Sequence, residues 1–176
     1  MTEYTIHFGL KNNSSVRVCT EPFLVDTTYT TIRMKMHIDG VEKMTDCARD
    51  FVLSLTPHVR AATVVSLSGD LGAGKTTFTQ GVARALAVEE VVTSPTFVIE
   101  KIYELSGQKW TRLIHIDAYR LKDMHELEVL GWHEIVQEPG NLILIEWPEM
   151  VASLIPKTAT RITIIGSDDV REISVE

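Results

Sequence analysis

A glycine-rich segment between an apolar run and a helical pattern constrains this chain more than any other feature. It reads GDLGAGKT over residues 69–76 and matches the pattern G-x-x-x-x-G-K-[ST] at every fixed position. The apolar run at residues 64–67 precedes it, and apolar residues at helical spacing follow it, namely Phe78, Val82, Ala85 and Leu86. This order of strand, glycine loop and helix predicts a P-loop, which holds the phosphates of a nucleoside triphosphate. The alternative is a chance glycine turn, which rarely meets all the fixed positions.

The chemistry of a P-loop assigns roles to two of its residues. Glycines let successive backbone N–H groups point at the phosphates, and the N-terminus of the following helix adds partial positive charge. Lys75 is expected to reach the β- and γ-phosphates, and the Thr76 hydroxyl is expected to ligate Mg²⁺. The cofactors predicted from the loop are therefore a nucleoside triphosphate and Mg²⁺.

Length and charge narrow the class of protein. A chain of 176 residues fits one domain with a sizeable core. A net charge of −7 without a run of basic residues argues against a broad nucleic-acid surface, so RNA would be reached through a partner. Cys19 and Cys47 have no metal-ligand spacing, and neither a membrane-length apolar run nor a secretory signal is visible. We therefore expect a cytoplasmic protein that does not enter a membrane.

The remaining patterns predict an α/β fold of the P-loop NTPase type. We expect a mainly parallel sheet with helices on both faces and antiparallel strands at its edges. Residues 1–26 are read as an N-terminal extension, either a hairpin or a disordered or non-native segment, and residues 27–176 as the P-loop domain. Before the P-loop we expect a strand at 27–38 and a helix at 41–55. After the P-loop helix we expect a strand-like segment at 91–99 interrupted by Ser-Pro-Thr, a hairpin of 101–105 with 112–116, and a helix from Asp123 that Gly131 weakens. The last expected elements are a fully buried strand at 142–145 and a terminal hairpin of 160–165 with 170–175 at a sheet edge.

Two apolar strands end in a carboxylate, at Asp117 and at Glu146. Either acid would suit a Walker B position, which holds Mg²⁺ directly or through water, and Glu146 is preferred because its strand is expected to be the more central. Thr96 follows the P-loop helix on a loop constrained by Pro95, where it is placed either as a switch residue that senses the γ-phosphate or in a plain turn. His115 is interpreted as structural.

Four motifs occur in order over residues 68–149: SGDLGAGKTTF, SPTF, HIDAYRL with an ELEVLGW helix, and LIEWPE. The series resembles the TsaE (YjeE) family, small bacterial P-loop ATPases of tRNA threonylcarbamoyladenosine synthesis, and the likeness extends more weakly over residues 41–175. Residues 1–26 have no counterpart in that family. The resemblance implies ATP binding and slow hydrolysis in support of TsaD and TsaB homologues, which transfer threonylcarbamoyl to N6 of adenosine 37. The tRNA would be contacted only indirectly, through that complex.

The resemblance also implies a set of site residues. The phosphate loop would consist of Gly72, Ala73, Gly74, Lys75, Thr76 and Thr77. Thr76 and Glu146 would hold Mg²⁺, Asp117 would be a catalytic acid near the γ-phosphate, Thr96 the switch residue, and Trp147 part of the lining.

Three further residues would contact the nucleotide by the same resemblance. Thr45 corresponds to a nucleotide-contacting threonine on the first helix, although its pattern alone suggests an ordinary surface residue. Met44 stands where the family usually has an acidic residue. Glu149 and Arg171 match positions that approach the nucleotide from the C-terminal side.

Three other functions use a similar loop. A small-molecule P-loop kinase needs additional positive charge around the transferred phosphoryl group, yet the arginines here are scattered rather than gathered in a lid. A GTPase would carry an N-K-x-D motif, which is absent from the sequence. A nucleotide-gated scaffold would hardly hydrolyse ATP alone, and stimulation of turnover by partner proteins separates it from a partner-dependent ATPase. The sequence leaves open which acid orients the water and whether an arginine is supplied in trans.

Overall fold

The centre of the sheet is parallel. In the computed structural model, which describes residues 34–167 and 170–176, β2 (Thr63–Ser68) lies between β5 (Asn141–Glu146) and β6 (Thr160–Ser167), and β5 continues to β4 (Arg112–Asp117). All residues of β5 are buried, as expected for a strand covered on both faces. The predicted central, fully buried strand is confirmed.

Antiparallel strands complete a seven-stranded sheet of order β1-β7-β6-β2-β5-β4-β3. The predicted hairpin of β3 (Glu100–Glu104) with β4 is confirmed. The terminal hairpin of β6 with β7 (Val170–Val175) forms, but its predicted position at a sheet edge is wrong. β1 (Met34–Asp39) pairs with β7 along its whole length and takes the edge instead. The predicted extension at 1–26, and the first part of the strand predicted at 27–38, lie outside the described residues.

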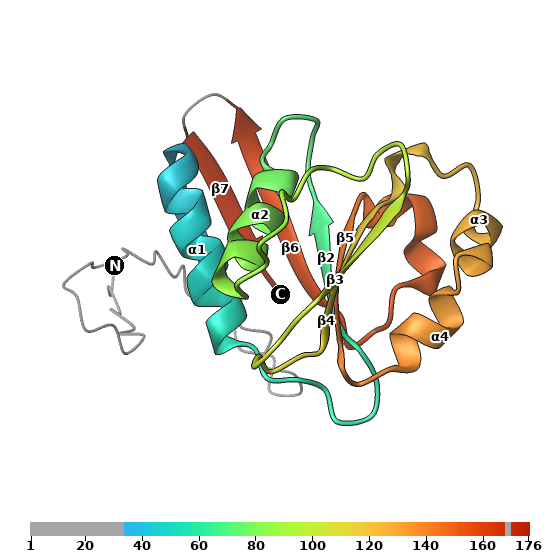
Figure 1. The fold of residues 1–176 in the computed structure, drawn as a ribbon. Coiled ribbons are helices and arrows are strands. Elements are labelled where there is room, and N and C mark those ends of the chain that lie inside the picture. The colour runs from blue at the N-terminus through green and yellow to red at the C-terminus, as the bar shows by residue number, and fades with distance from the viewer. Residues whose placement is uncertain (1–33, 168–169) are drawn as a thin grey trace, which may run out of the picture.

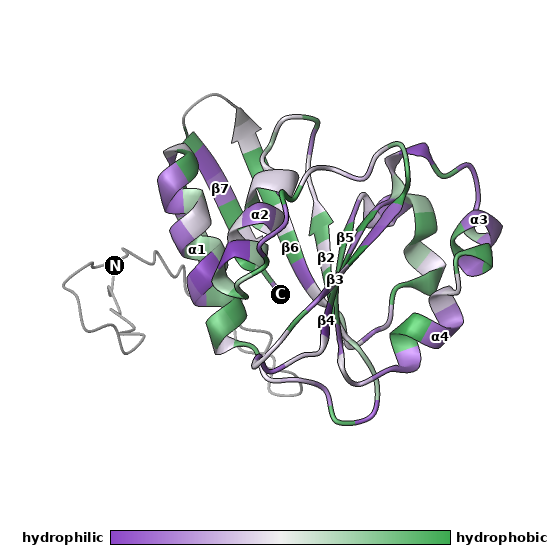
Figure 2. Ribbon diagram, viewed as in Figure 1, coloured by the Kyte–Doolittle hydropathy of each residue, from purple (hydrophilic) through white to green (hydrophobic). Residues whose placement is uncertain are grey.

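Helices cover both faces of the sheet, as predicted (Figure 1). α1 (Gly40–Ser54) and α2 (Lys75–Ala85) pack on one face, and α3 (Met124–Val129) and α4 (Trp132–Gln137) lie on the other with the 3-10 segments η1 (Ala118–Arg120) and η2 (Pro148–Leu154). Each layer has its own apolar cluster, and Figure 2 shows that the helices contain both hydrophobic and hydrophilic residues. Within the described part of the chain, no helix has the length and apolar character needed to cross a membrane.

Two predicted elements differ from the structure. The helix expected from Asp123 is two short helices, because Gly131 adopts a left-handed conformation with φ +83° and begins α4. Its predicted start is confirmed, since the Asp123 carboxylate accepts a hydrogen bond from the Glu126 N–H. Residues 91–99 form no strand: the Val98 and Ile99 N–H groups both donate to the Pro95 carbonyl, which produces a turn.

The contact between α1 and α2 depends on a glycine. A Cβ atom added at Gly81 would lie 2.7 Å from Ala48 Cβ and 3.1 Å from Thr45 Cα. Because Thr45 Cα belongs to the backbone, a side-chain rotation cannot remove this contact. Gly81 therefore sets how closely α1 approaches the P-loop helix.

We predict that Gly81→Ala lowers the free energy of unfolding, although alanine gains about 1 kcal/mol of helix propensity. Overpacking typically costs about 1–3 kcal/mol, and here the two helices would have to separate. Chemical denaturation of both proteins measures the difference. Gly81→Ala in an Ala48→Gly background should recover part of the loss, because the nearest atom is removed. Stability equal to or above that of the parent in Gly81→Ala alone would contradict the interpretation.

Candidate functional site

The glycine-rich loop connects β2 to α2 through backbone conformations that other residues rarely adopt. Gly69 has φ +142°, and a Cβ there would lie 2.2 Å from the Ile164 carbonyl oxygen. Gly74 has φ +111° at the start of α2, where a Cβ would lie 3.2 Å from the Met44 methyl group. The loop can therefore follow this path only with glycine at these two positions.

The loop borders a cavity of about 450 Å³ at the carboxyl ends of β4 and β5. In open α/β sheets, ligands bind at this end of the strands. The cavity contains two carboxylates, two cationic side chains, two aromatic rings and several hydroxyls. It is lined by Leu71, Gly72, Gly74, Lys75, Thr76, Thr77, Ser94, Thr96, Asp117, Tyr119, Arg120, Glu146 and Trp147.

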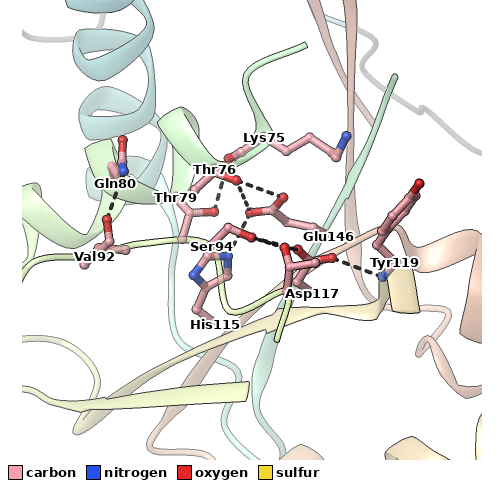
Figure 3. A network of polar contacts seen from close by, with 11 residues as sticks. Lys75, Thr76, Thr79, Gln80, Val92, Ser94, His115, Asp117, Tyr119 and Glu146 are labelled. Atoms are coloured by element: carbon pink, nitrogen blue, oxygen red, sulfur yellow. Dashed lines mark hydrogen bonds and ion pairs between the residues drawn. The ribbon is translucent and has the colours of Figure 1, made fainter. Parts of the chain in front are cut away.

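Glu146 forms the first polar cluster of the site (Figure 3). The Thr76 hydroxyl lies 3.0 and 3.2 Å from its two carboxylate oxygens, and His115 Nε2 lies 2.8 Å from Oε1. His115 is fully buried and Glu146 is only 2% exposed. Because an ionised carboxylate only accepts hydrogen bonds, Nε2 carries the ring proton, and Nδ1 has no partner among the described residues.

Asp117 forms the second cluster. Its Oδ2 accepts from the Ser94 hydroxyl at 2.8 Å and from the Thr96 hydroxyl at 2.5 Å, while its Oδ1 accepts from the Tyr119 N–H at 3.0 Å. The two hydroxyl oxygens lie 2.6 Å from each other. Asp117 therefore fixes both the loop that carries Thr96 and the start of η1 (Figure 3).

Lys75 lies at the first turn of α2 and folds back over the loop. Its ammonium group donates to the carbonyls of Gly69 at 2.6 Å and Asp70 at 2.8 Å. Burial lowers the pKa of Lys75, and the carboxylates of the site, Glu146 first among them, oppose this shift. A partly desolvated cation next to a cavity attracts anions more strongly than a hydrated one.

Two aromatic rings form one wall of the cavity. The Lys75 ammonium lies 3.9 Å from the centre of a Trp147 ring, and Tyr119 packs on Trp147 with ring centres 5.0 Å apart. Trp147 has φ +58°, a left-handed conformation that is unfavourable for a residue with a bulky side chain. Such conformations are concentrated at functional sites, where the surrounding structure holds them.

A metal ion at this site would depend on ligands from outside the protein. Among the described residues, no group of three or more His, Cys, Asp or Glu side chains is arranged to hold one. The hydroxyl of Thr76 and the carboxylate of Glu146 are adjacent oxygen donors, which suits Mg²⁺ completed by phosphate oxygens and water.

Comparison with known proteins identifies the family. The sequence model described as "Threonylcarbamoyl adenosine biosynthesis protein TsaE" matches residues 38–173. The TsaE protein of Borreliella burgdorferi is 33% identical over 80% of this chain and 99% of its own length. The chain belongs to the TsaE family.

A sequence and a crystal structure from Bacillus subtilis support the assignment. The TsaE protein of that organism is 42% identical over 63% of this chain and 67% of its own length. The crystal structure of Bacillus subtilis YdiB matches with a TM-score of 0.66 and 30% identity, over 84% of this chain and 87% of that one. The resemblance of the four motifs to the TsaE family is thereby confirmed, as is the fold.

Most of the predicted site residues meet at the cavity of this TsaE-family chain. Four do not line it: Thr45, Ala73, Glu149 and Arg171. The Thr45 hydroxyl donates to the Val41 carbonyl of its own helix, whereas the Arg171 guanidinium donates to the Ala73 carbonyl at 2.9 Å and supports the loop from behind. Glu149 is exposed, but near enough to Lys75 to favour its charged form. Their contact with nucleotide stays a prediction.

Several residues of the site were not among the predicted ones. Ser94, Tyr119 and Arg120 line the cavity, and His115 holds Glu146. Ser94 and Arg120 belong to the SPTF and HIDAYRL motifs, which could have pointed to them. The role of His115 follows from the parallel pairing of β4 with β5, which no local pattern reveals.

We predict that His115→Leu destabilises the protein through Glu146. Leaving a buried carboxylate without one of its donors costs about 1–3 kcal/mol. A double-mutant cycle with Glu146→Gln tests this: the double variant should be less destabilised than the sum of the single variants, with a coupling of about 0.5–3 kcal/mol measured by chemical denaturation. Additive losses would show that the two side chains do not interact.

Proposed function

We propose that this chain is a Mg²⁺-dependent ATPase that supports the transfer of threonylcarbamoyl to N6 of adenosine 37 of tRNA, together with TsaB and TsaD homologues. One observation carries the proposal: the P-loop threonine, Thr76, is hydrogen-bonded to the buried carboxylate of Glu146 at the mouth of a cavity that also contains Lys75. The relatives are named tRNA threonylcarbamoyladenosine biosynthesis protein TsaE, and this name supplies the pathway.

The loop would bind the phosphates. Backbone N–H groups between Gly72 and Thr77 would hold their oxygens, with support from the N-terminus of α2. Lys75, held over the loop by the Gly69 and Asp70 carbonyls, would place its ammonium group against the β- and γ-phosphates. Trp147 would confine the nucleotide on the side of the aromatic wall.

Thr76 and Glu146 would hold the metal ion. When bound, Mg²⁺ would offset the negative charge that develops on the phosphates. His115 would keep the Glu146 carboxylate turned toward Thr76 through its Nε2–H.

The contacts of the two acids support a division of their roles. Glu146 is bonded to Thr76 on the P-loop, whereas Asp117 is bonded to Thr96 on the loop after α2. A threonine there is suited to sense the γ-phosphate, so the acid in contact with it would lie on the side from which water attacks. We therefore assign the orientation of the water to Asp117 and the metal to Glu146.

The partner and compartment assignments rest on charge and family. The net charge of −7 disfavours direct tRNA binding, so tRNA would be reached through TsaB and TsaD. The reducing cytoplasm, where tRNA is modified, is the proposed location.

The decisive experiment measures ATP turnover by the purified chain, alone and with TsaB and TsaD from the same organism. We expect slow hydrolysis that the partners stimulate, with the radiolabelled γ-phosphate released to water. Lys75→Ala should abolish hydrolysis, because the phosphates lose their main cationic partner. Rapid, partner-independent transfer of the label to a small molecule would instead identify a kinase.

A second prediction concerns the metal. Glu146→Ala should remove the Mg²⁺ dependence of nucleotide binding, with the enhancement of ADP affinity by Mg²⁺ falling by about tenfold or more. Fluorescence titration of labelled ADP with and without Mg²⁺ measures the effect. Glu89→Ala, which removes an exposed carboxylate after α2, is the control for net charge. An unchanged magnesium enhancement in Glu146→Ala would rule out Glu146 as a metal ligand.

A further inference from the structure

The transition state of the proposed reaction requires more positive charge than Lys75 alone provides. In ATP hydrolysis the water oxygen bonds to the γ-phosphorus, and the bond to the β–γ bridging oxygen breaks, so that ADP leaves with the electron pair. The proton lost from water passes to phosphate or to solvent. Negative charge is then spread over the equatorial γ-oxygens, and P-loop enzymes commonly place an arginine there, supplied either by the same chain or by a partner.

Among the described residues that line the cavity, two carry positive charge: Lys75 and Arg120. Arg120 is the last residue of η1, the short segment that directly follows Asp117. The Asp117 carboxylate accepts the Tyr119 N–H and so fixes the turn that carries Arg120. The arginine is therefore positioned by the same acid to which we assign the attacking water.

Among the residues that the structure describes, the guanidinium group of Arg120 has an aromatic partner and no acidic one. Its central carbon lies 4.6 Å from the ring centre of Phe97, which follows Thr96 and is 85% exposed. Within the described ranges the structure records no ion pair or hydrogen bond from Arg120. Three other arginines do have such partners: Arg49 and Arg112 pair with carboxylates, and Arg171 donates to a carbonyl.

Stacking on a ring orients a guanidinium group and leaves its N–H donors available. An arginine with this freedom, in a cavity that also contains a P-loop lysine, is suited to bind the oxygens of a phosphoryl group bidentately. Phe97 also connects Arg120 to the loop of Thr96, because the ring that stacks on Arg120 belongs to the residue next to Thr96.

We propose that Arg120 is a catalytic residue that stabilises the transferring γ-phosphoryl group in cis. The proposal rests on the ATPase function proposed above. It requires that the chain complete its transition-state site without an arginine from TsaB or TsaD. Arginines in this role accelerate hydrolysis by roughly 10³–10⁵-fold in other P-loop enzymes.

The test measures the affinity of the full chain for labelled ADP with Mg²⁺, with and without aluminium fluoride, which mimics the transferring phosphoryl group. The parent chain alone should bind ADP about tenfold or more tightly with aluminium fluoride than without it. Arg120→Ala should lose this gain and keep its affinity for ADP within about threefold. Arg120→Lys should recover only part of the gain, because lysine cannot bind two oxygens bidentately.

Arg84→Ala is the matched control. It removes the same charge from the exposed last turn of α2, at the end opposite Lys75, and should behave as the parent. A gain that survives in Arg120→Ala overturns the proposal. The proposal is also overturned if the parent chain alone binds ADP no more tightly with aluminium fluoride than without it, whether or not a gain in affinity appears once TsaB and TsaD are added. If the parent chain does not bind ADP, or binds ADP no more tightly than the Lys75→Ala variant does, the ATPase proposal itself fails.

Discussion

The site depends on one partly buried contact, the hydrogen bond between Thr76 and the buried carboxylate of Glu146. It joins the first turn of α2 to the end of β5, and His115 extends it to β4. A buried carboxylate is tolerated only when its lone pairs are used, so these donors fix the relative positions of three elements. The contact also requires parallel strands, because only then do the ends of β2, β4 and β5 meet at the same edge of the sheet.

The P-loop is supported from behind by residues distant in sequence. Met44 on α1 packs against Gly74, and Arg171 on β7 donates to the Ala73 carbonyl. Gly81 allows α1 to approach α2 closely enough for the first of these contacts. Met44, at the position where the family resemblance implies an acidic residue, is buried and only 1% exposed. An apolar side chain in that position supports the loop by packing rather than by charge.

Local patterns in the sequence predicted the elements that carry their own signal. The P-loop follows from fixed glycines, and β5 from an uninterrupted apolar run with an acid at its end. Positions that depend on distant partners were not predictable in this way. Polar and apolar residues alternate along β7 in the same way whether the strand lies at the sheet edge or pairs with β1. Its partner β1 is near the other end of the described chain, so no local pattern reveals the pairing. Likewise, Gly131 weakens a helix in any sequence, but only its left-handed conformation shows that it begins a new one.

The Asp117 cluster shows how the site can be both ordered and changeable. Two contacts join Asp117 to the hydroxyls of Ser94 and Thr96 and a third joins the hydroxyls to each other, yet two hydroxyls supply only two protons. One of the three contacts is therefore always without a proton, and the loop is held less firmly than the short distances suggest. If Thr96 turned toward a phosphate, Asp117 would keep Ser94 on one oxygen and the Tyr119 N–H on the other. The turn that carries Arg120 would then stay in place while the loop moved, which allows phosphate sensing without loss of the geometry around Asp117.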